Sequence, residues 1–214
     1  MMTLLAIVVG YLLGSISGSL LLGKLRGVDI RTQGSGNAGG TNAFRTQGAA
    51  FALGVVAIDI GKGALAAWLG SRSWFGAAPV LADPAQSLLC GSAAAVGHVW
   101  PLFHGFRGGK GAGTLVGVIA VVFPIALVPL LVAWAFALTS TGYVGLATVL
   151  AGAMLPVAAQ LLAEPAERDA LVAFGIAAAL FLAFTHRSNL ARLARGTEHR
   201  FERARLFHRR RGAK

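Results

Sequence analysis

The sequence predicts an all-α, polytopic transmembrane helical bundle that forms a single domain over residues 1–214. Only 13% of the side chains are charged, whereas an average soluble domain carries about 25%, and 56% are hydrophobic. Residues 1–23, 111–163 and 170–185 contain no charged side chain. As a helix, the stretch 111–163 would extend about 80 Å, so it must cross a hydrocarbon core of about 30 Å at least twice.

Positive charges set the orientation of the chain. Lys24, Arg26, Arg31 and Arg45 follow the first apolar segment. The positive-inside rule places them in the cytoplasm and the N-terminus outside. By the same rule, the basic tail, about residues 197–214, places the C-terminus in the cytoplasm. We therefore interpret the net charge of +11 as a topology signal that touches anionic lipid headgroups, and we predict no nucleic-acid partner.

The next segments follow in order along the chain. Residues 48–69 are apolar except for Asp59 and Lys62, which lie three apart on one helical face and can pair there. Residues 71–83 suit a short outer loop. A third segment, 85–103, then returns the chain to the cytoplasm.

Two prolines decide the predicted number of crossings. If Lys110 and His186 are both cytoplasmic, an even number of crossings must separate them. Pro124 and Pro129 can divide residues 112–138 into two short or broken helices. The two remaining segments are 142–162 and 171–185. This pattern predicts seven helices, and five, with one segment re-entrant or oblique, is the alternative.

Three polar islands interrupt the apolar chain, at residues 34–42, 97–111 and 186–192. Each combines glycine with small hydroxyl or amide side chains and with cations, which are the ingredients of a phosphate-binding site. Each lies beside an uncharged stretch on the predicted cytoplasmic side. Taken alone, each island is also compatible with an ordinary polar loop. Together they predict phosphate chemistry at a membrane surface.

The first two islands supply glycine-rich turns. In the first, glycines including Gly36 let backbone N–H groups face an anion. Its neutral side-chain donors are Ser35, Asn37, Thr41 and Asn42. The second island ends in the turn 108–111, which opens into an apolar helix, so free N–H groups and the positive helix end would converge with Lys110. This turn is not a Walker A loop, because His104 stands in place of the first glycine and Gly111 in place of Ser or Thr.

The third island adds a histidine, an amide and a cation. On a helix that continues past His186, Asn189 shares its face and Arg192 lies near it, able to bind a second anion. A helix-capping or interfacial role is the alternative for His186 alone. Together with His98 the histidines form no metal set, and Cys90 as the single cysteine excludes an intramolecular disulfide, so no cofactor or metal is predicted.

Taken together, the islands resemble a known family, the bacterial membrane acyltransferases that transfer a fatty acyl group from acyl phosphate to glycerol 3-phosphate. The resemblance spans nearly the whole chain, and the motifs stand in the family's order and spacing. They are Gly34-Ser35-Gly36-Asn37-x-Gly39-x-Thr41-Asn42 with Arg45, Asp59-x-x-Lys62-Gly63, Gly97-His98-x-x-Pro101-x-Phe103-x-x-Phe106-Arg107-Gly108-Gly109-Lys110-Gly111, and His186-Arg187-x-Asn189-Leu190-x-Arg192-Leu193 followed by Gly196-Thr197-Glu198.

The resemblance implies a reaction that gives 1-acyl-glycerol 3-phosphate (lysophosphatidic acid) and phosphate, the first step of bacterial phospholipid synthesis. Acyl phosphate would be the donor, in place of acyl carrier protein or coenzyme A thioesters. We expect a monomer in the bacterial inner membrane, with its active site facing the cytoplasm and no partner besides its substrates and lipids. A membrane transporter of phosphate or of a phosphorylated small molecule is the alternative, although no inverted repeat is visible.

Roles for individual residues follow from the same resemblance. The predicted catalytic residues are Ser35, Lys110, His186 and Asn189. The predicted substrate-binding residues are Gly36, Asn37, Thr41, Asn42, Arg45, Lys62, His98, Gly108, Gly109, Gly111 and Arg192. We expect Lys110, the 108–111 backbone and Ser35 to hold the acyl phosphate, and Arg45, His186, Asn189 and Lys62 to orient glycerol 3-phosphate; the reverse assignment stays open. The hydroxyl proton would leave to the departing phosphate or, as the alternative, to His186.

Overall fold

The computed structural model describes residues 2–72 and 84–204, and every regular element in these two stretches is helical. The α-helices are α1 (Met2–Gly14), α2 (Gly18–Leu25), α3 (Gly40–Gln47), α4 (Ala49–Gly70), α5 (Ala85–Val99), α6 (Ala112–Val122), α7 (Leu127–Thr141), α8 (Val144–Leu162), α9 (Arg168–Thr185) and α10 (Arg187–Ala194). The all-α prediction is therefore confirmed. Most of the predicted outer loop, residues 73–83, and the end of the basic tail, 205–214, lie outside the described residues.

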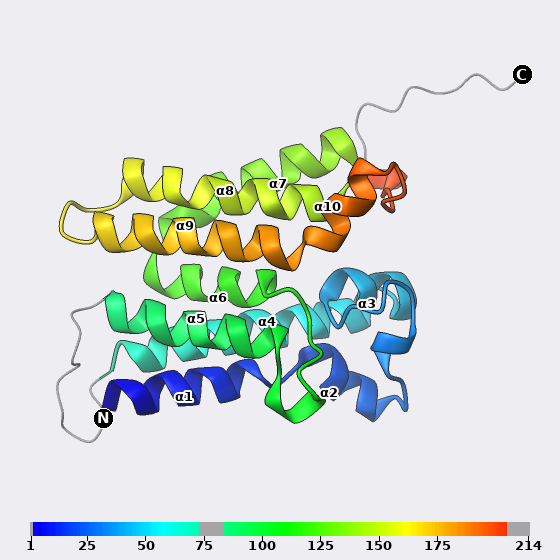
Figure 1. Ribbon diagram of the computed structural model, residues 1–214, viewed down its shortest axis with the longest axis horizontal. Helices are drawn as coiled ribbons and strands as arrows, with labels where there is room; N and C mark the ends of the chain where they lie inside the picture. The colour runs from blue at the N-terminus through cyan, green and yellow to red at the C-terminus, as the bar shows by residue number, and fades with distance from the viewer. Residues whose placement is uncertain (1, 73–83, 205–214) are drawn as a thin grey trace, which may run out of the picture.

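The long helices lie side by side in two layers (Figure 1). One layer contains α1, α4, α5 and α6, which pack against one another, and the other contains α7, α8 and α9. The short helices α2, α3 and α10 gather at one end of the bundle, on the right in Figure 1, together with the α5–α6 connection. The three polar islands therefore meet at one end of the molecule.

Fewer than seven of the described helices are long and apolar enough to span a membrane by themselves. Among the described residues, four helical stretches are long and apolar enough to span a membrane: Ala49–Gly70, Pro124–Thr141, Val144–Leu162 and Arg168–Thr185. The pair α1 and α2, bent by 44°, brings the number to five if it is one span. Helices α5 and α6 are shorter, so the count of seven stays a prediction.

The predicted break near the prolines occurs at Pro124. Helix α6 ends at Val122, and a short 3₁₀ turn, Pro124–Ala126, leads into α7. Pro129 lies in the first turn of α7 and does not interrupt it, because backbone N–H groups in the first turn have no intrahelical partner to lose.

Glycines bring the helices of the first layer into close contact. A Cβ atom on Gly14 would collide with the backbone of Ala94 in α5, and one on Gly97 would collide with the α1 backbone. In the same way, Gly63 of α4 and Gly117 of α6 leave no room for a side chain at their crossing. Small residues of this kind let membrane helices approach closely, so this layer is a closely packed support for the loops at its polar end.

Candidate active site

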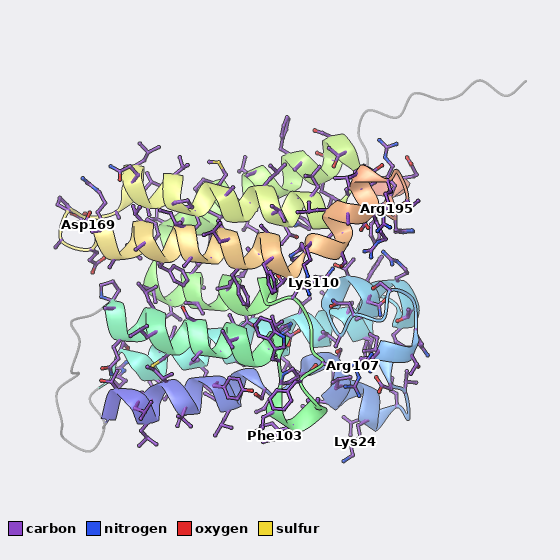
Figure 2. All side chains as sticks on the ribbon, viewed as in Figure 1. Lys24, Phe103, Arg107, Lys110, Asp169 and Arg195 are labelled. Carbon is purple, nitrogen blue, oxygen red and sulfur yellow. The ribbon has the colours of Figure 1, made fainter. Side chains whose placement is uncertain are left out.

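A cavity of about 790 Å³ opens where the polar islands meet. Of the predicted site residues, its lining contains Ser35, Asn37, Thr41, Asn42, Arg45, His98, Lys110, Gly111, His186, Asn189 and Arg192. Gly36, Lys62, Gly108 and Gly109 are not part of the lining. Figure 2 shows Lys110 between α3 and α10, whereas Lys24 and Phe103 lie at the edge of the molecule.

The side chain of Asn42 forms hydrogen bonds to the backbone of the first island and of the segment before it. Its Oδ1 accepts a hydrogen bond of 2.9 Å from the Ser35 backbone, and its Nδ2 donates to the carbonyls of Ile30 and Gln33. The side chain is 2% exposed. Since these bonds occupy the amide, Asn42 positions Ser35 at the cavity and has little capacity left to bind a ligand.

The turn 108–111 of the second island does not present all of the free backbone N–H groups that the sequence predicted. The N–H of Gly108 donates to the carbonyl of Val99, and the N–H of Gly109 donates to that of His98, both at 3.1 Å. These two amides are therefore used inside the loop and do not point to a ligand. A phosphate at this turn would meet Lys110 and the first amides of α6. This helix begins directly after Gly111, whose backbone is in the left-handed conformation (φ 84°).

A hydrogen-bond network joins the second island to the third. The Lys110 ammonium donates to Oδ1 of Asn189, and the Asn189 amide donates to Oε1 of Glu198 at 2.6 Å. Glu198 also accepts from Nε of Arg192 at 2.6 Å. The sequence interpretation included Glu198 in a motif but gave it no role. The signal was available, because Glu198 is one of only two carboxylates, with Glu202, in the basic segment 187–214.

The environment lowers the pKa of two of the four catalytic candidates, Lys110 and His186. Burial, followed by the nearby Arg192 charge, lowers the pKa of Lys110 to about 8. Burial, followed by the Lys110 ammonium, lowers the pKa of His186 to about 4. His186 Nδ1 lies 2.9 Å from the carbonyl of Leu182, so this nitrogen carries the proton of the neutral ring. Nε2 is then the nitrogen with a free lone pair.

The segment after α10 folds back over the polar end of the cavity. Phe201 donates its backbone N–H to the carbonyl of Gly142 at 2.8 Å. The guanidinium of Arg45 lies 5.7 Å from the centre of the Phe201 ring, within the range of a cation–π contact. This segment connects α3 to the end of α7 and contributes Thr197, Glu198, His199 and Phe201 to the lining.

The remaining lining is largely apolar and comes from the membrane-spanning helices. Leu53 and Val56 belong to α4, and Trp134 and Leu138 belong to α7. The indole N–H of Trp134 donates to Thr148 of α8 at 3.4 Å, which fixes the ring against that helix. The cavity therefore combines a cationic end with an apolar wall. Among the described residues, no group of three or more His, Cys, Asp and Glu side chains could hold a metal ion.

The comparisons with known proteins agree with this combination of a polar and an apolar end. The family model described as glycerol-3-phosphate acyltransferase matches residues 4–196. The chain belongs to this family. The glycerol-3-phosphate acyltransferase of Chlorobaculum parvum is 38% identical over 227 residues, which cover 94% of this chain and 97% of the relative. That of Symbiobacterium thermophilum is 40% identical over 193 residues, or 90% and 92% of the two chains.

Solved structures place this glycerol-3-phosphate acyltransferase fold in the membrane. The crystal structure of PlsY (YgiH), an integral membrane glycerol 3-phosphate acyltransferase, in its glycerol 3-phosphate form is similar with a TM-score of 0.83 and 33% identity, covering 94% of this chain and 96% of PlsY. Its lysophosphatidic acid form gives 0.81 and 32%, with 94% and 95% covered. This chain is therefore an integral membrane acyltransferase.

Proposed function

We propose that this acyltransferase moves a fatty acyl group from acyl phosphate to the sn-1 hydroxyl of glycerol 3-phosphate. The products are lysophosphatidic acid and inorganic phosphate. The observation that carries the proposal is the cavity itself, where Ser35, Lys110, His186 and Asn189 meet from three distant segments beside an apolar wall. A reaction that joins a phosphorylated polyol to a lipid chain needs both kinds of surface.

Lys110 and Ser35 are the groups that we assign to the donor phosphate. Lys110 is at the start of α6, so a phosphate there interacts with the ammonium and with the positive end of the helix dipole. Ser35 adds a hydroxyl donor from the opposite loop. Asn189 already accepts a hydrogen bond from Lys110 and so limits the directions in which the ammonium can point.

Arg45 and Arg192 are the cations that remain for glycerol 3-phosphate. Both line the cavity, and both come from elements other than the Lys110 turn. Arg192 is held by Glu198, and Arg45 lies against Phe201. Asn37, Thr41 and His186 can hydrogen-bond to the glycerol hydroxyls. Lys62, Gly108 and Gly109 act from outside the lining as supports for the site.

The chemical step needs little beyond alignment and charge stabilisation. The sn-1 oxygen attacks the acyl carbon, the bond from that carbon to the phosphate oxygen breaks, and the hydroxyl proton moves to the departing phosphate. Acyl phosphate is an activated mixed anhydride, so positioning two like-charged substrates is the main barrier. With its pKa lowered to about 4, neutral His186 is a weak base, which favours the phosphate as proton acceptor.

The membrane orientation is part of the same proposal. The elements at the cavity end are α2, α3 and the loops beside them, and their sequence contains Lys24, Arg26, Arg31, Arg45 and Arg107. The positive-inside rule places such a surface in the cytoplasm. The apolar chain of the donor then enters from the inner membrane, and glycerol 3-phosphate arrives from the cytoplasm. In this proposal the protein is a monomer that crosses the membrane seven times. It works without a metal, cofactor or protein partner.

The decisive experiment supplies purified protein in lipid with radiolabelled glycerol 3-phosphate and one donor at a time: palmitoyl phosphate, palmitoyl-CoA or none. We expect lysophosphatidic acid and phosphate from palmitoyl phosphate alone. No product from any donor in folded protein would overturn the proposal and direct attention to phosphate transport in liposomes.

A variant of His186 tests the route of the proton. His186→Ala should retain measurable turnover if the departing phosphate accepts the proton. A loss in kcat of more than about ten-thousandfold, with unchanged binding of glycerol 3-phosphate, would instead make His186 the base.

A further inference from the structure

A charged cluster lies inside the membrane-spanning part of the bundle, and it includes two of the predicted substrate-binding residues, Lys62 and His98. Asp59 and Lys62 of α4 have side chains that are each 5% exposed, and Nζ lies 3.1 Å from Oδ1. His98 of α5 completes the cluster, with Nδ1 at 3.5 Å from the same oxygen. Ionisable side chains at such positions are costly, so they are expected to have a function and named partners.

Lys62 joins α4 to the break between α1 and α2. Its ammonium donates to the carbonyls of Gly14 at 2.9 Å and Ile16 at 2.7 Å. These carbonyls stand where α1 ends, and a helix end leaves such groups without intrahelical partners. With Asp59 as the third acceptor, all three donors of the ammonium are used. Lys62 therefore has no donor left for a substrate.

Asp59 joins the same break to α5. Its Oδ1 accepts from the backbone N–H of Gly18, the first residue of α2, at 3.2 Å. Nδ1 of His98 forms no hydrogen bond among the described residues, and its contact with Asp59 at 3.5 Å is electrostatic. Both Asp59 and His98 also border the cavity.

His98 connects the cluster to the Lys110 turn. Its carbonyl accepts the N–H of Gly109 at 3.1 Å. A Cβ atom on Gly109 would collide with the His98 imidazole ring, so the ring and the turn are in direct contact. The next residue after Gly109 is Lys110. The His98 ring therefore lies against the backbone that leads into Lys110.

We propose that Asp59 and Lys62 are positioning residues of the acyltransferase, which hold His98 and, through its contact with Gly109, set the position of Lys110 at the cavity. This inference rests on the proposed function, because it assigns Lys110 to the donor phosphate. A displacement of about 1 Å in such a group is enough to lower turnover about a hundredfold. The pair thus acts on catalysis without touching substrate.

Steady-state kinetics in lipid test the proposal. Asp59→Asn keeps the shape of the side chain and removes its charge. We expect kcat to fall at least about tenfold, toward the hundredfold of a misplaced group, while KM for glycerol 3-phosphate stays within about threefold. The matched control is Gln86→Met, which removes a buried hydrogen bond from α5 to the carbonyl of Gly70. An unchanged kcat in Asp59→Asn, or an equal loss in the control, overturns the proposal.

The titration of Lys110 gives a readout that does not depend on turnover. We measure amine labelling at Lys110 against pH by mass spectrometry. Burial is the main cause that lowers its pKa to about 8, so a turn released into water should shift the titration upward in Asp59→Asn and not in Gln86→Met. The charged or titratable groups that face Lys110 are Arg45, His186, Arg192 and Glu198, and none of them is altered.

A double-mutant cycle separates action through His98 from a general structural role. His98→Gln removes the ring that contacts Gly109. If Asp59 acts through that ring, adding Asp59→Asn to His98→Gln should lower kcat by less than about threefold, because coupled residues are not additive. Fully additive losses overturn the route through His98. A wild-type protein without acyltransferase activity would refute the proposed function instead, and the labelling would still test the position of Lys110.

Discussion

Lys62 and Lys110 lie in two polar regions of the same bundle that hold an ammonium group in opposite ways. Lys62, in the intramembrane cluster, is enclosed and has three acceptors at 2.7–3.1 Å. Lys110, at the cavity, is half-buried, and the described residues give its ammonium one hydrogen bond, to Asn189. Arg192 and Arg45 further raise the positive potential around it.

The difference indicates which lysine is built for a ligand. An ammonium with three acceptors is already neutralised locally, so an added phosphate would have to displace protein groups. An ammonium that is partly dehydrated, near other cations and short of acceptors gains most when an anion arrives. Residue type and depth in the fold are therefore poor guides to function here, whereas the number of satisfied donors separates the two roles.

The largest effect should come from Lys110→Ala. We expect kcat/KM for palmitoyl phosphate to fall about a thousandfold, on the order of 4 kcal/mol, because the substitution removes the ammonium that binds the donor phosphate. The apparent melting temperature should not fall, since the ammonium that is removed has one hydrogen bond and lies near two other cations. The control is Lys24→Ala, which changes an exposed lysine at the edge of the molecule (Figure 2). Retention of more than about one tenth of the activity would contradict this role.

Lys62→Met should show the opposite pattern in stability. It leaves Asp59 buried without its cation, which costs about 3–5 kcal/mol for a broken buried ion pair. Chemical and thermal unfolding in detergent would measure the loss. Replacing both residues, as Asp59→Leu with Lys62→Met, should recover part of the stability without recovering turnover. If the double variant is as unstable as Lys62→Met, the unpaired carboxylate is not the cause.

The pH dependence follows from the lowered pKa of Lys110. Lys110 must be protonated to attract phosphate, so kcat/KM should be constant below its pKa and should fall as pH rises through about 8. A bound phosphate favours the charged form and raises the pKa, so the fall in kcat should occur at higher pH than the fall in kcat/KM. A profile without a decline up to pH 10 would exclude Lys110 as the titrating group.

The sequence was sufficient for features that depend on local spacing. The three-residue separation of Asp59 and Lys62 predicted their pairing, and Pro124 predicted the end of α6. The positive-inside rule predicted one common side for all three polar islands, and these do meet at one end of the bundle. Of the 15 predicted site residues, 11 also line the cavity.

Other features depend on contacts between distant segments, which spacing does not encode. Gly108 and Gly109 looked like free phosphate donors because nothing local shows that their N–H groups reach the carbonyls of Val99 and His98. Glu198 fell in the predicted basic tail, and spacing does not show that the chain returns after α10 and brings it to Asn189 and Arg192. The span count also stays open, since α5 and α6 are shorter than their apolar sequence segments.

Glu198→Gln tests how the surroundings of Lys110 set its charge. The Glu198 charge raises the pKa of Lys110, so its removal should move the alkaline fall in kcat/KM to lower pH. Loss of the ion pair to Arg192 should also raise KM for glycerol 3-phosphate, by about threefold to tenfold for a partly exposed pair. Steady-state kinetics at a series of pH values would measure both the KM and the pH at which kcat/KM falls. A shift to higher pH would contradict the sign of this interaction.

The smallest effect should appear at the apolar wall, where neither lysine acts. Trp134 lines the cavity and is fixed by Thr148, so Trp134→Ala should create room for a longer chain. In a competition between palmitoyl and stearoyl phosphate, we expect the ratio of kcat/KM to shift toward stearoyl by about threefold to fivefold, which corresponds to about 0.8 kcal/mol for one buried methylene. Phe136→Ala is the matched control, because Phe136 lies on the same helix, is 70% exposed and does not border the cavity. Equal shifts in both variants would mean that the change comes from the lipid-facing surface of α7 and not from the cavity wall.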